Sequence, residues 1–340
     1  MPLIIPVFIP HQGCPHCCVF CNQYQISGQS DPESVTPDVV QGIIEKWLQR
    51  SAKRATDEVQ VAFYGGSFTG LPVSRQEELL DAVVPFVRRG DVQTIRLSTR
   101  PDYIDRQRIS LLLEKGVGIV ELGVQSMDDR VLEASNRGHS AKQSAEAVGL
   151  LHEAGFLVGA QIMIGLPLQT TRSVLKTVRI IAGLKPDFVR IYPVLVLKGS
   201  GLAHLYEQGR YKPLSVAGAV VRAARIKKML DEYGIKVIRM GLQSGVDLEN
   251  NLIAGPYHPA FGEMVASRIM LQQTRKILAG RGEKTKLILR INEKDQSVFR
   301  GIKSCNMHRL TELRLIDRFT LQTDSALPRQ CIQVAHAPAS

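Results

Sequence analysis

Four of the six cysteines in this chain of 340 residues lie within eight positions, in the segment Cys14-Pro15-His16-Cys17-Cys18-Val19-Phe20-Cys21. Three of them, Cys14, Cys18 and Cys21, form a C-x3-C-x2-C pattern. A cubane 4Fe-4S cluster takes one protein ligand per iron, so three thiolates leave one iron open. Three-ligand zinc sites keep a catalytic position open in the same way. The sequence therefore predicts a 4Fe-4S cluster whose open iron can be chelated by the amino and carboxylate groups of a substrate.

Other uses of these cysteines stay open. A zinc ion would take a fourth ligand, for which Cys17, His11 and His16 are at hand, and a structural or electron-transfer cluster and a disulfide are further alternatives. The two remaining cysteines, Cys305 and Cys331, lie far along the chain. Crowding of four cysteines is typical of metal or redox sites rather than of a disulfide framework.

The elements that must position this loop alternate between strands and helices. Apolar runs predict strands over residues 3–9, 59–64, 94–99, 118–124, 156–164 and 188–192. Start and stop signals predict helices from residue 36 and over residues 74–88, 105–115, 140–154 and 171–182. Six strand–helix units predict an α/β fold with a parallel sheet, and near-continuous apolar strands indicate that both sheet faces are covered. A doubly wound sheet and an incomplete barrel both fit this pattern.

Glycines and polar residues gather at or near the carboxyl ends of these strands, where α/β barrels build their active sites. They are Gly65, Gly66, Ser98, Gln125, Gln161, Met163 and Tyr192. Two of these positions have a plainer explanation as well. The glycine pair can be an ordinary turn at the end of a strand, and Ser98 can belong to a capped turn before a helix.

Glu121 lies four residues before Gln125, so both side chains point to the same face of their strand. An acidic side chain in a buried parallel strand is costly unless it has a partner. We therefore expect Glu121 either to pair with an arginine or to shape a substrate pocket.

In sequence order, these segments resemble the radical S-adenosylmethionine (SAM) superfamily. The resemblance rests on the cysteine pattern with Phe20 before its third cysteine, on Tyr64-Gly65-Gly66-Ser67-Phe68, on Gly123-Val124-Gln125-Ser126, on Asn136-Arg137-Gly138-His139 and on Gly165-Leu166-Pro167. It implies an incomplete (β/α)6 radical SAM barrel with a C-terminal α+β extension. It also implies a 4Fe-4S cluster that cleaves SAM to a 5′-deoxyadenosyl radical, and an electron donor such as flavodoxin or ferredoxin.

The resemblance assigns SAM contacts residue by residue. Gly65 and Gly66 would receive the amino group, Arg137 the carboxylate, and Gln125 the ribose. Ser98 stands where some relatives have an acidic residue near the ribose or methionine part. The residues on the adenine side would be Gln161, Met163 and Tyr192.

Within this superfamily the chain is most similar to the Elongator catalytic-subunit family, from about Pro6 to Gly241. The matching segments include Ser98-Thr99-Arg100-Pro101-Asp102, Ile191-Tyr192-Pro193-Val194-Leu195 and Lys198-Gly199-Ser200-Gly201-Leu202. That family modifies wobble uridines of transfer RNA (tRNA), so the resemblance implies tRNA or another nucleic acid as partner. The residues after Gly241 show no glycine-rich acetyl-CoA loop, so the resemblance does not extend to the acetyltransferase domain of that family.

Two other functions stay open. The Gly-Val-Gln-Ser and Gly-Leu-Pro motifs also occur in radical SAM enzymes that act on a small molecule, such as the oxygen-independent coproporphyrinogen oxidases. A non-catalytic iron-sulfur protein that binds RNA or acts as a sensor would keep the cluster, but it has no need of the SAM contacts at Gly65, Gly66, Gln125 and Arg137.

The rest of the chain is assigned more coarsely. Soft boundaries predict a partial barrel over residues 1–200, a substrate-side extension over 201–282 and a basic segment over 283–340, with a helix over 216–233 and strands over 235–240, 287–291 and 319–322. The turn-rich segment 254–263 supplies His258 and Glu263 as candidate substrate contacts, alongside Glu121; an ordinary packed loop is the alternative.

The net charge of +11 is concentrated late in the chain, where residues 271–340 hold 13 Lys and Arg against six Asp and Glu. A basic end favours an anionic partner such as nucleic acid, although a solvated basic surface has the same composition. No apolar run reaches the ~18 residues of a membrane span, and no signal peptide is evident at the N-terminus. We therefore expect a cytoplasmic protein without a membrane partner.

Overall fold

A computed structural model describes residues 2–14, 18–22, 35–51, 58–280 and 286–335. The chain divides into two compact units. The first unit comprises residues 1–215 and 229–257, and the second comprises residues 216–228 and 258–340. The domain boundaries expected near residues 200 and 282 remain predictions.

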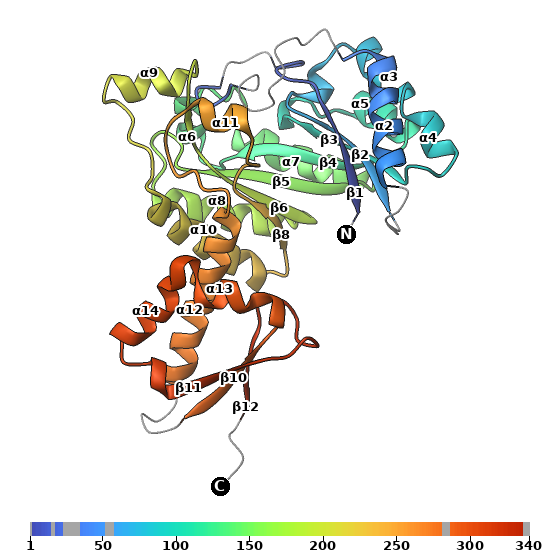
Figure 1. Cartoon of the computed structure of the whole chain (residues 1–340). Coiled ribbons are helices and arrows are strands. Elements are labelled where there is room, and N and C mark those ends of the chain that lie inside the picture. The colour runs from blue at the N-terminus through green and yellow to red at the C-terminus, as the bar shows by residue number, and fades with distance from the viewer. Residues whose placement is uncertain (1, 15–17, 23–34, 52–57, 281–285, 336–340) are drawn as a thin grey trace. The chain divides into compact units, whose positions relative to one another are not determined.

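The first unit is built on a seven-stranded sheet with the order β1-β2-β3-β4-β5-β6-β8, in which every neighbouring pair is parallel (Figure 1). Its strands are β1 (Leu3–Phe8), β2 (Val59–Tyr64), β3 (Thr94–Thr99), β4 (Val117–Gln125), β5 (Leu157–Ile164), β6 (Phe188–Pro193) and β8 (Lys236–Met240). The expected α/β fold with a parallel sheet is confirmed, and the strand expected over residues 235–240 joins it as the seventh.

The sheet is curled. The Tyr64 hydroxyl, at the end of β2, accepts a hydrogen bond of 3.1 Å from Arg190 Nη2 on β6, although three strands separate the two. Neighbouring strands lie about 4.8 Å apart, so a flat sheet would hold β2 and β6 ~19 Å apart, beyond the joint reach of the two side chains. The sheet therefore forms a partial barrel with an interior face, which confirms the expected fold class.

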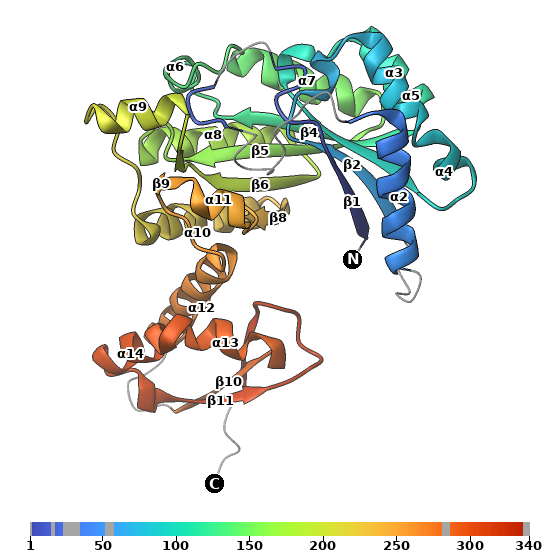
Figure 2. The ribbon, with the colours of Figure 1, turned by 45° about the horizontal axis from the view of Figure 1, so that its top comes forward.

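Helices connect the strands along the outer side of this sheet, as Figure 2 shows for α2, α3 and α5. The helices of the connections are α2 (Pro37–Ser51), α3 (Val73–Asp81), α4 (Val84–Arg88), α5 (Arg106–Glu114), α6 (Asp129–Ala134), α7 (Ala141–Glu153), α8 (Thr171–Leu184) and α9 (Gly201–Glu207). The helix α10 (Val216–Glu232) precedes β8 in the chain, and its residues 216–228 belong to the second unit. Capping boxes start α7 at Ser140 and α8 at Thr170, as their side chains favour. Short elements complete this unit: β7 (Val196–Leu197), α11 (Val246–Asn250) and β9 (Leu252–Ala254).

One expected helix is wrong in extent. Residues 74–88 do not form a single helix but the two helices α3 and α4. Pro85 causes the break, because it has no backbone N–H for helix bonding and restricts the residue before it. It is accommodated in the first turn of α4, where an N–H has no helical partner anyway.

The second unit has its own small sheet, with the order β11-β10-β12. Its elements after residue 258 are α12 (Phe261–Ala279), β10 (Leu287–Ile291), α13 (Gln296–Arg300), α14 (Cys305–Glu312), β11 (Phe319–Thr323) and β12 (Ile332–Ala335). The three helices lie on the same side of the sheet (Figures 1 and 2). Their apolar faces enclose a core that includes Met270, Leu278, Leu289, Phe299 and Phe319. This is the expected α+β extension, although α12 had no counterpart in the sequence analysis.

No helix in the described part of the chain is long and apolar enough to cross a membrane.

Candidate active site at the carboxyl ends of the barrel strands

The cysteine loop follows β1 and is held by backbone hydrogen bonds. Val19 N–H donates to the Ser135 carbonyl at 3.1 Å, and the Val19 carbonyl accepts from Leu202 N–H at 2.6 Å. Cys18, next to Val19, is buried, while Cys14 and Cys21 are half-buried. The loop is therefore fixed between the end of α6 and the start of α9. Of the three alternative zinc ligands, Cys17 and His16 lie outside the described residues, and His11 is half-buried at the start of the loop.

The glycine pair after β2 supports this loop. Gly65 has a φ of +93°, and its carbonyl accepts from His11 N–H at 3.1 Å. A Cβ on Gly66 would overlap the carbonyl oxygens of Ile9 and Gln12. Close packing of two backbones is thus a reason for glycine here that the sequence analysis did not identify, and the assignment of the pair to the SAM amino group remains a prediction.

Arg137 lies beside the cysteines. Its Nη1 is 3.5 Å from Cys18 Sγ, its Nη2 donates to the Gly123 carbonyl at 2.7 Å, and its buried Nε has no hydrogen-bond partner in the structure. Burial raises the pKa of the Cys14 thiol, and Cys18 adds to this rise, whereas Arg137 and Arg100 oppose it. A fixed guanidinium at this position favours negative charge, whether on thiolates or on a carboxylate ligand.

Arg100 is a second buried arginine in this region, only 2% exposed. Its Nε and Nη2 donate to the two oxygens of Asp102 at 3.0 and 2.7 Å, while its buried Nη1 has no hydrogen-bond partner within the described part of the chain. The Ser67 and Thr99 hydroxyls are 3.1 Å apart and tie the ends of β2 and β3 together above it. The sequence analysis gave Arg100 no role, although its place directly after a strand end is the signal that singled out the other site residues.

A glutamine pair lies at the ends of β4 and β5. Gln161 Nε2 donates to Gln125 Oε1 at 2.8 Å, and a bulge at Gly123–Gln125 gives Gln125 a φ of +64°. Met163 follows two residues after Gln161 and is buried, and Ser98 on β3 is half-buried opposite Glu121. The structure therefore brings Gln125 and Gln161 together, as their places at neighbouring strand ends predict.

Glu121 is the centre of a buried polar network on the interior face. Its Oε2 forms an ion pair of 2.7 Å with Arg190 Nε, and its Oε1 accepts from Arg96 Nε and, at 3.3 Å, from the Tyr64 hydroxyl. Arg190 Nη1 donates to the Tyr192 hydroxyl at 3.2 Å. Two guanidinium groups and one carboxylate leave this network with an excess positive charge.

The pKa values in the network follow from its composition. Burial raises the pKa of Tyr64, and Glu121 raises it further, against the opposing effect of the two arginines. Burial acts to lower the pKa of Arg190, but Glu121, Tyr192 and Tyr64 outweigh it, so this pKa lies above its ordinary value. Glu121 thus has the arginine partner that its burial requires. Arg96 and Arg190 were not predicted as site residues. Arg96 lies two residues before Ser98, and Arg190 two residues before Tyr192, so each pair shares a strand face.

His258 and Glu263 belong to the second unit. His258 Nδ1 accepts from Ala260 N–H at 3.0 Å, just before α12, and Glu263 is exposed. The hydrogen bond of His258 is typical of a turn residue. The substrate role of His258 and Glu263 stays a prediction. Among the described residues, no three His, Cys, Asp or Glu side chains converge on one metal-ion position.

Two family models match the chain. One, described as the radical SAM superfamily, matches residues 8–181, and the other, described as the radical SAM C-terminal domain, matches residues 186–271. The first covers half of the chain, including the cysteine loop and the strand ends β1 to β5.

Individual relatives point in the same direction. The chain is 26% identical to a tRNA uridine(34) acetyltransferase of Methanocaldococcus jannaschii, over 68% of this chain and 49% of the relative. It is 28% identical to human Elongator complex protein 3, over 66% of this chain and 48% of the relative. The chain thus spans about half the length of these two relatives. In structure it resembles the archaeal Methanocaldococcus infernus Elp3, with a TM-score of 0.63 and 22% identity over 80% of this chain and 63% of that one.

Proposed function

This chain belongs to the radical SAM superfamily, and on that premise we propose that it is an enzyme that cleaves SAM at a 4Fe-4S cluster and acts on a base of tRNA. The observation that carries the proposal is the buried Arg137 beside Cys18 at the carboxyl ends of the strands, whose Nε has no hydrogen-bond partner among the residues that the structure describes. Members of this superfamily generally use a 4Fe-4S cluster together with SAM.

The residues present fit such a cluster. Cys14, Cys18 and Cys21 would supply three thiolates, and a cluster with three thiolates carries negative charge that the neighbouring Arg137 and Arg100 can balance. When bound, the cluster supplies the electron that breaks a carbon–sulfur bond of SAM and yields the 5′-deoxyadenosyl radical. The chain itself binds and orients the reactants.

We assign SAM to the polar residues at the strand ends beside the cysteine loop. The Arg137 guanidinium would hold the carboxylate, and the pair Gln125–Gln161 would donate and accept hydrogen bonds at the ribose. Gly65 and Gly66 would face the amino group, with Ser98, Met163 and Tyr192 along the remainder of the ligand. The buried network around Glu121 ties β3, β4 and β6 together on the interior face of the same sheet.

The tRNA part of the proposal is supported by the relatives. A tRNA uridine(34) acetyltransferase and Elongator complex protein 3 both match about two thirds of this chain. A chain with a net charge of +11 also suits a polyanionic substrate.

The test is SAM cleavage by the protein after anaerobic reconstitution of its cluster. We expect 5′-deoxyadenosine to form with a reductant, and to form faster with bulk tRNA than without it. If 5′-deoxyadenosine forms at the same rate with and without tRNA, the alternative of a small-molecule substrate, such as a coproporphyrinogen, is favoured. If the protein holds a complete cluster but forms no 5′-deoxyadenosine, the alternative of a non-catalytic iron-sulfur protein is favoured.

Arg137→Gln is the matching variant. We expect it to keep its iron content while SAM cleavage falls by ~100-fold, because the SAM carboxylate loses a desolvated charge partner. The control is Arg130→Gln on α6, whose side chain is 85% exposed, and which should cleave SAM as the wild type does. Wild-type cleavage by Arg137→Gln would contradict the carboxylate assignment.

A further inference from the structure

The net charge of the chain is distributed very unevenly between its two units. The second unit, 96 residues in all, holds 18 Lys and Arg against seven Asp and Glu, a net charge of +11. The first unit holds 25 of each sign and has no net charge. The entire charge excess of the protein therefore belongs to the unit that lacks Cys14, Cys18, Cys21 and the strands of the seven-stranded sheet.

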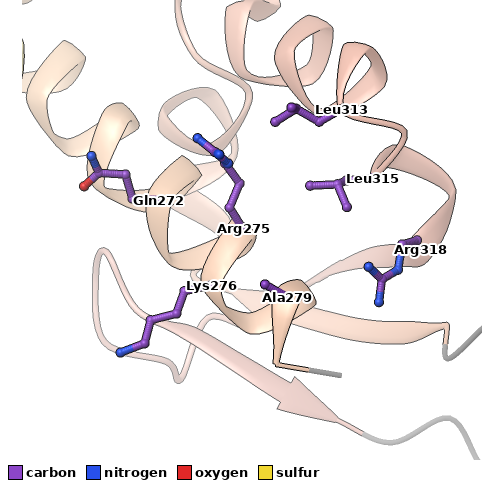
Figure 3. Close-up of a pocket in the computed structure, with 7 residues that line it drawn as sticks. All are labelled: Gln272, Arg275, Lys276, Ala279, Leu313, Leu315 and Arg318. Atoms are coloured by element: carbon purple, nitrogen blue, oxygen red, sulfur yellow. The ribbon is translucent and has the colours of Figure 1, made fainter. Parts of the chain in front are cut away.

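A pocket in the second unit concentrates part of this charge. It has a volume of about 540 Å³ and lies between α12 and the connection from α14 to β11. Figure 3 shows the side chains that line it, which are Gln272, Arg275, Lys276, Ala279, Leu313, Leu315 and Arg318. Three of the seven are cationic and none is acidic.

The pocket is built on the side of α12 that faces away from the core. Met270, Thr274 and Leu278 of this helix are buried, whereas Arg275 and Lys276 are exposed. Arg318 Nη2 donates to the Leu278 carbonyl at 3.0 Å and so ties the last turn of α12 to the start of β11. Cationic side chains surround the apolar, partly exposed Leu313 and Leu315. Such a surface suits a ligand with a charged backbone and flat apolar parts, which is the chemistry of RNA.

We propose that the second unit is the RNA-binding part of the protein and that this pocket takes a backbone phosphate between Arg275, Lys276 and Arg318. The inference rests on the proposed action on tRNA and names the residues that hold it. Binding through phosphates is independent of sequence and depends on salt, because each neutralised phosphate releases counterions. The first unit, which has no net charge, then contributes recognition of the base and the chemistry, and it adds no long-range attraction for the tRNA.

The experiment compares tRNA binding by full-length, cluster-loaded variants, measured by fluorescence anisotropy over a range of salt concentrations. The pocket variant is Arg275→Gln/Lys276→Gln, since both side chains are exposed and neither contributes to the core. Arg318 is left in place because of its bond to α12. The control is Arg172→Gln/Lys176→Gln, which removes two exposed cations one turn apart on α8 of the first unit.

We expect the pocket variant to bind tRNA about tenfold more weakly at ~100 mM salt, with a salt dependence reduced by about one counterion per lost cation. The control should bind within about twofold of the wild type. Cleavage of SAM without tRNA should be unchanged in both variants, which shows that the barrel is intact.

Two other outcomes would overturn the inference. If the wild type binds tRNA and the pocket variant binds it equally well, or the control loses as much, the site is wrong while the proposed function stands. If the wild type binds vesicles of anionic phospholipid but not tRNA, the second unit is a membrane-binding element, and the tRNA part of the proposed function fails with it.

Discussion

At the scale of single residues, the most demanding feature is the Glu121 carboxylate, 4% exposed between the guanidinium groups of Arg96 and Arg190. A buried ion pair is a poor source of net stability, but removal of one partner leaves an uncompensated charge. Here removal of the carboxylate leaves two cations in the barrel interior. The network therefore depends on the Glu121 carboxylate for its charge balance, and the catalytic role expected for Glu121 remains a prediction.

We expect Glu121→Gln to lower the free energy of unfolding by about 3–5 kcal/mol, which corresponds to a drop in Tm of roughly 10 °C for a unit of this size. Thermal unfolding followed by circular dichroism measures it. Glu133→Gln, at an exposed position on α6, is the control and should change stability by less than ~0.5 kcal/mol. A Glu121→Gln variant that melts with the wild type would contradict the role given to this network.

His139 is the second residue with a measurable consequence. Burial, with Arg137 and Arg100 adding to it and Asp102 opposing, lowers the pKa of His139 to about 3. Its Nε2 lies 3.3 Å from the Val124 carbonyl. The folded protein thus holds this imidazole neutral, whereas the unfolded chain binds a proton below pH ~6.5.

The stability of the protein should therefore fall as the pH drops from ~6.5 toward 3, by up to about 1.4 kcal/mol per pH unit from this group. His139→Gln removes the titration, so the stability lost between pH 7 and pH 5 should be smaller by about 2 kcal/mol than in the wild type. Denaturant unfolding at the two pH values checks this. Equal losses in both proteins would show that His139 is not buried neutral.

At the scale of elements, the cysteine loop is positioned by backbone packing against the turn after β2. Gly13, Gly66 and Gly70 each lie where a Cβ would overlap a carbonyl oxygen of the opposite segment. The ligand loop therefore depends on the absence of side chains in a neighbouring loop, besides the cysteines themselves.

Gly66→Ala should displace the cysteine loop and lower the iron content after reconstitution, as measured by iron and sulfide analysis. Gly149→Ala is the matched control, because no atom lies within 4 Å of its added Cβ, and it should retain its iron and gain about 0.5–1 kcal/mol of stability within helix α7. Full iron content in Gly66→Ala would show that the loop tolerates the shift.

The elements themselves were largely predictable from local sequence. Apolar runs and Gly or Pro boundaries located the strands of the sheet, and Ser140 and Thr171 marked helix starts to within one residue. The curl was not predictable in this way, since contacts such as Tyr64 with Arg190 join positions 126 residues apart. The helix α12 was missed although Phe261, Val265 and Ile269 recur at helical spacing.

The site residues were likewise predictable where local sequence marks them and not where they depend on long-range contacts. The sequence identified positions at strand ends, and the pair Gln125–Gln161 meets as expected. It did not identify Arg96, Arg100 and Arg190, because an arginine in a strand looks like a surface residue until the burial of its strand face is known.

At the scale of the whole molecule, the two units differ in charge, with +11 on the second and none on the first. In the proposed function, the first unit, which has no net charge, carries the chemistry, and the basic second unit attracts the polyanionic tRNA. High salt should accordingly weaken tRNA binding while leaving SAM cleavage without tRNA unaffected.

The proposed function leads to a direct test if, as we propose, the radical formed from SAM takes a hydrogen atom from the tRNA on which the protein acts. The most direct measurement is mass spectrometry of the 5′-deoxyadenosine formed by the cluster-loaded protein with perdeuterated tRNA. We predict deuterium in the 5′-deoxyadenosine with this tRNA and none when it is replaced by ordinary tRNA. Turnover with perdeuterated tRNA that gives only unlabelled 5′-deoxyadenosine would contradict the account.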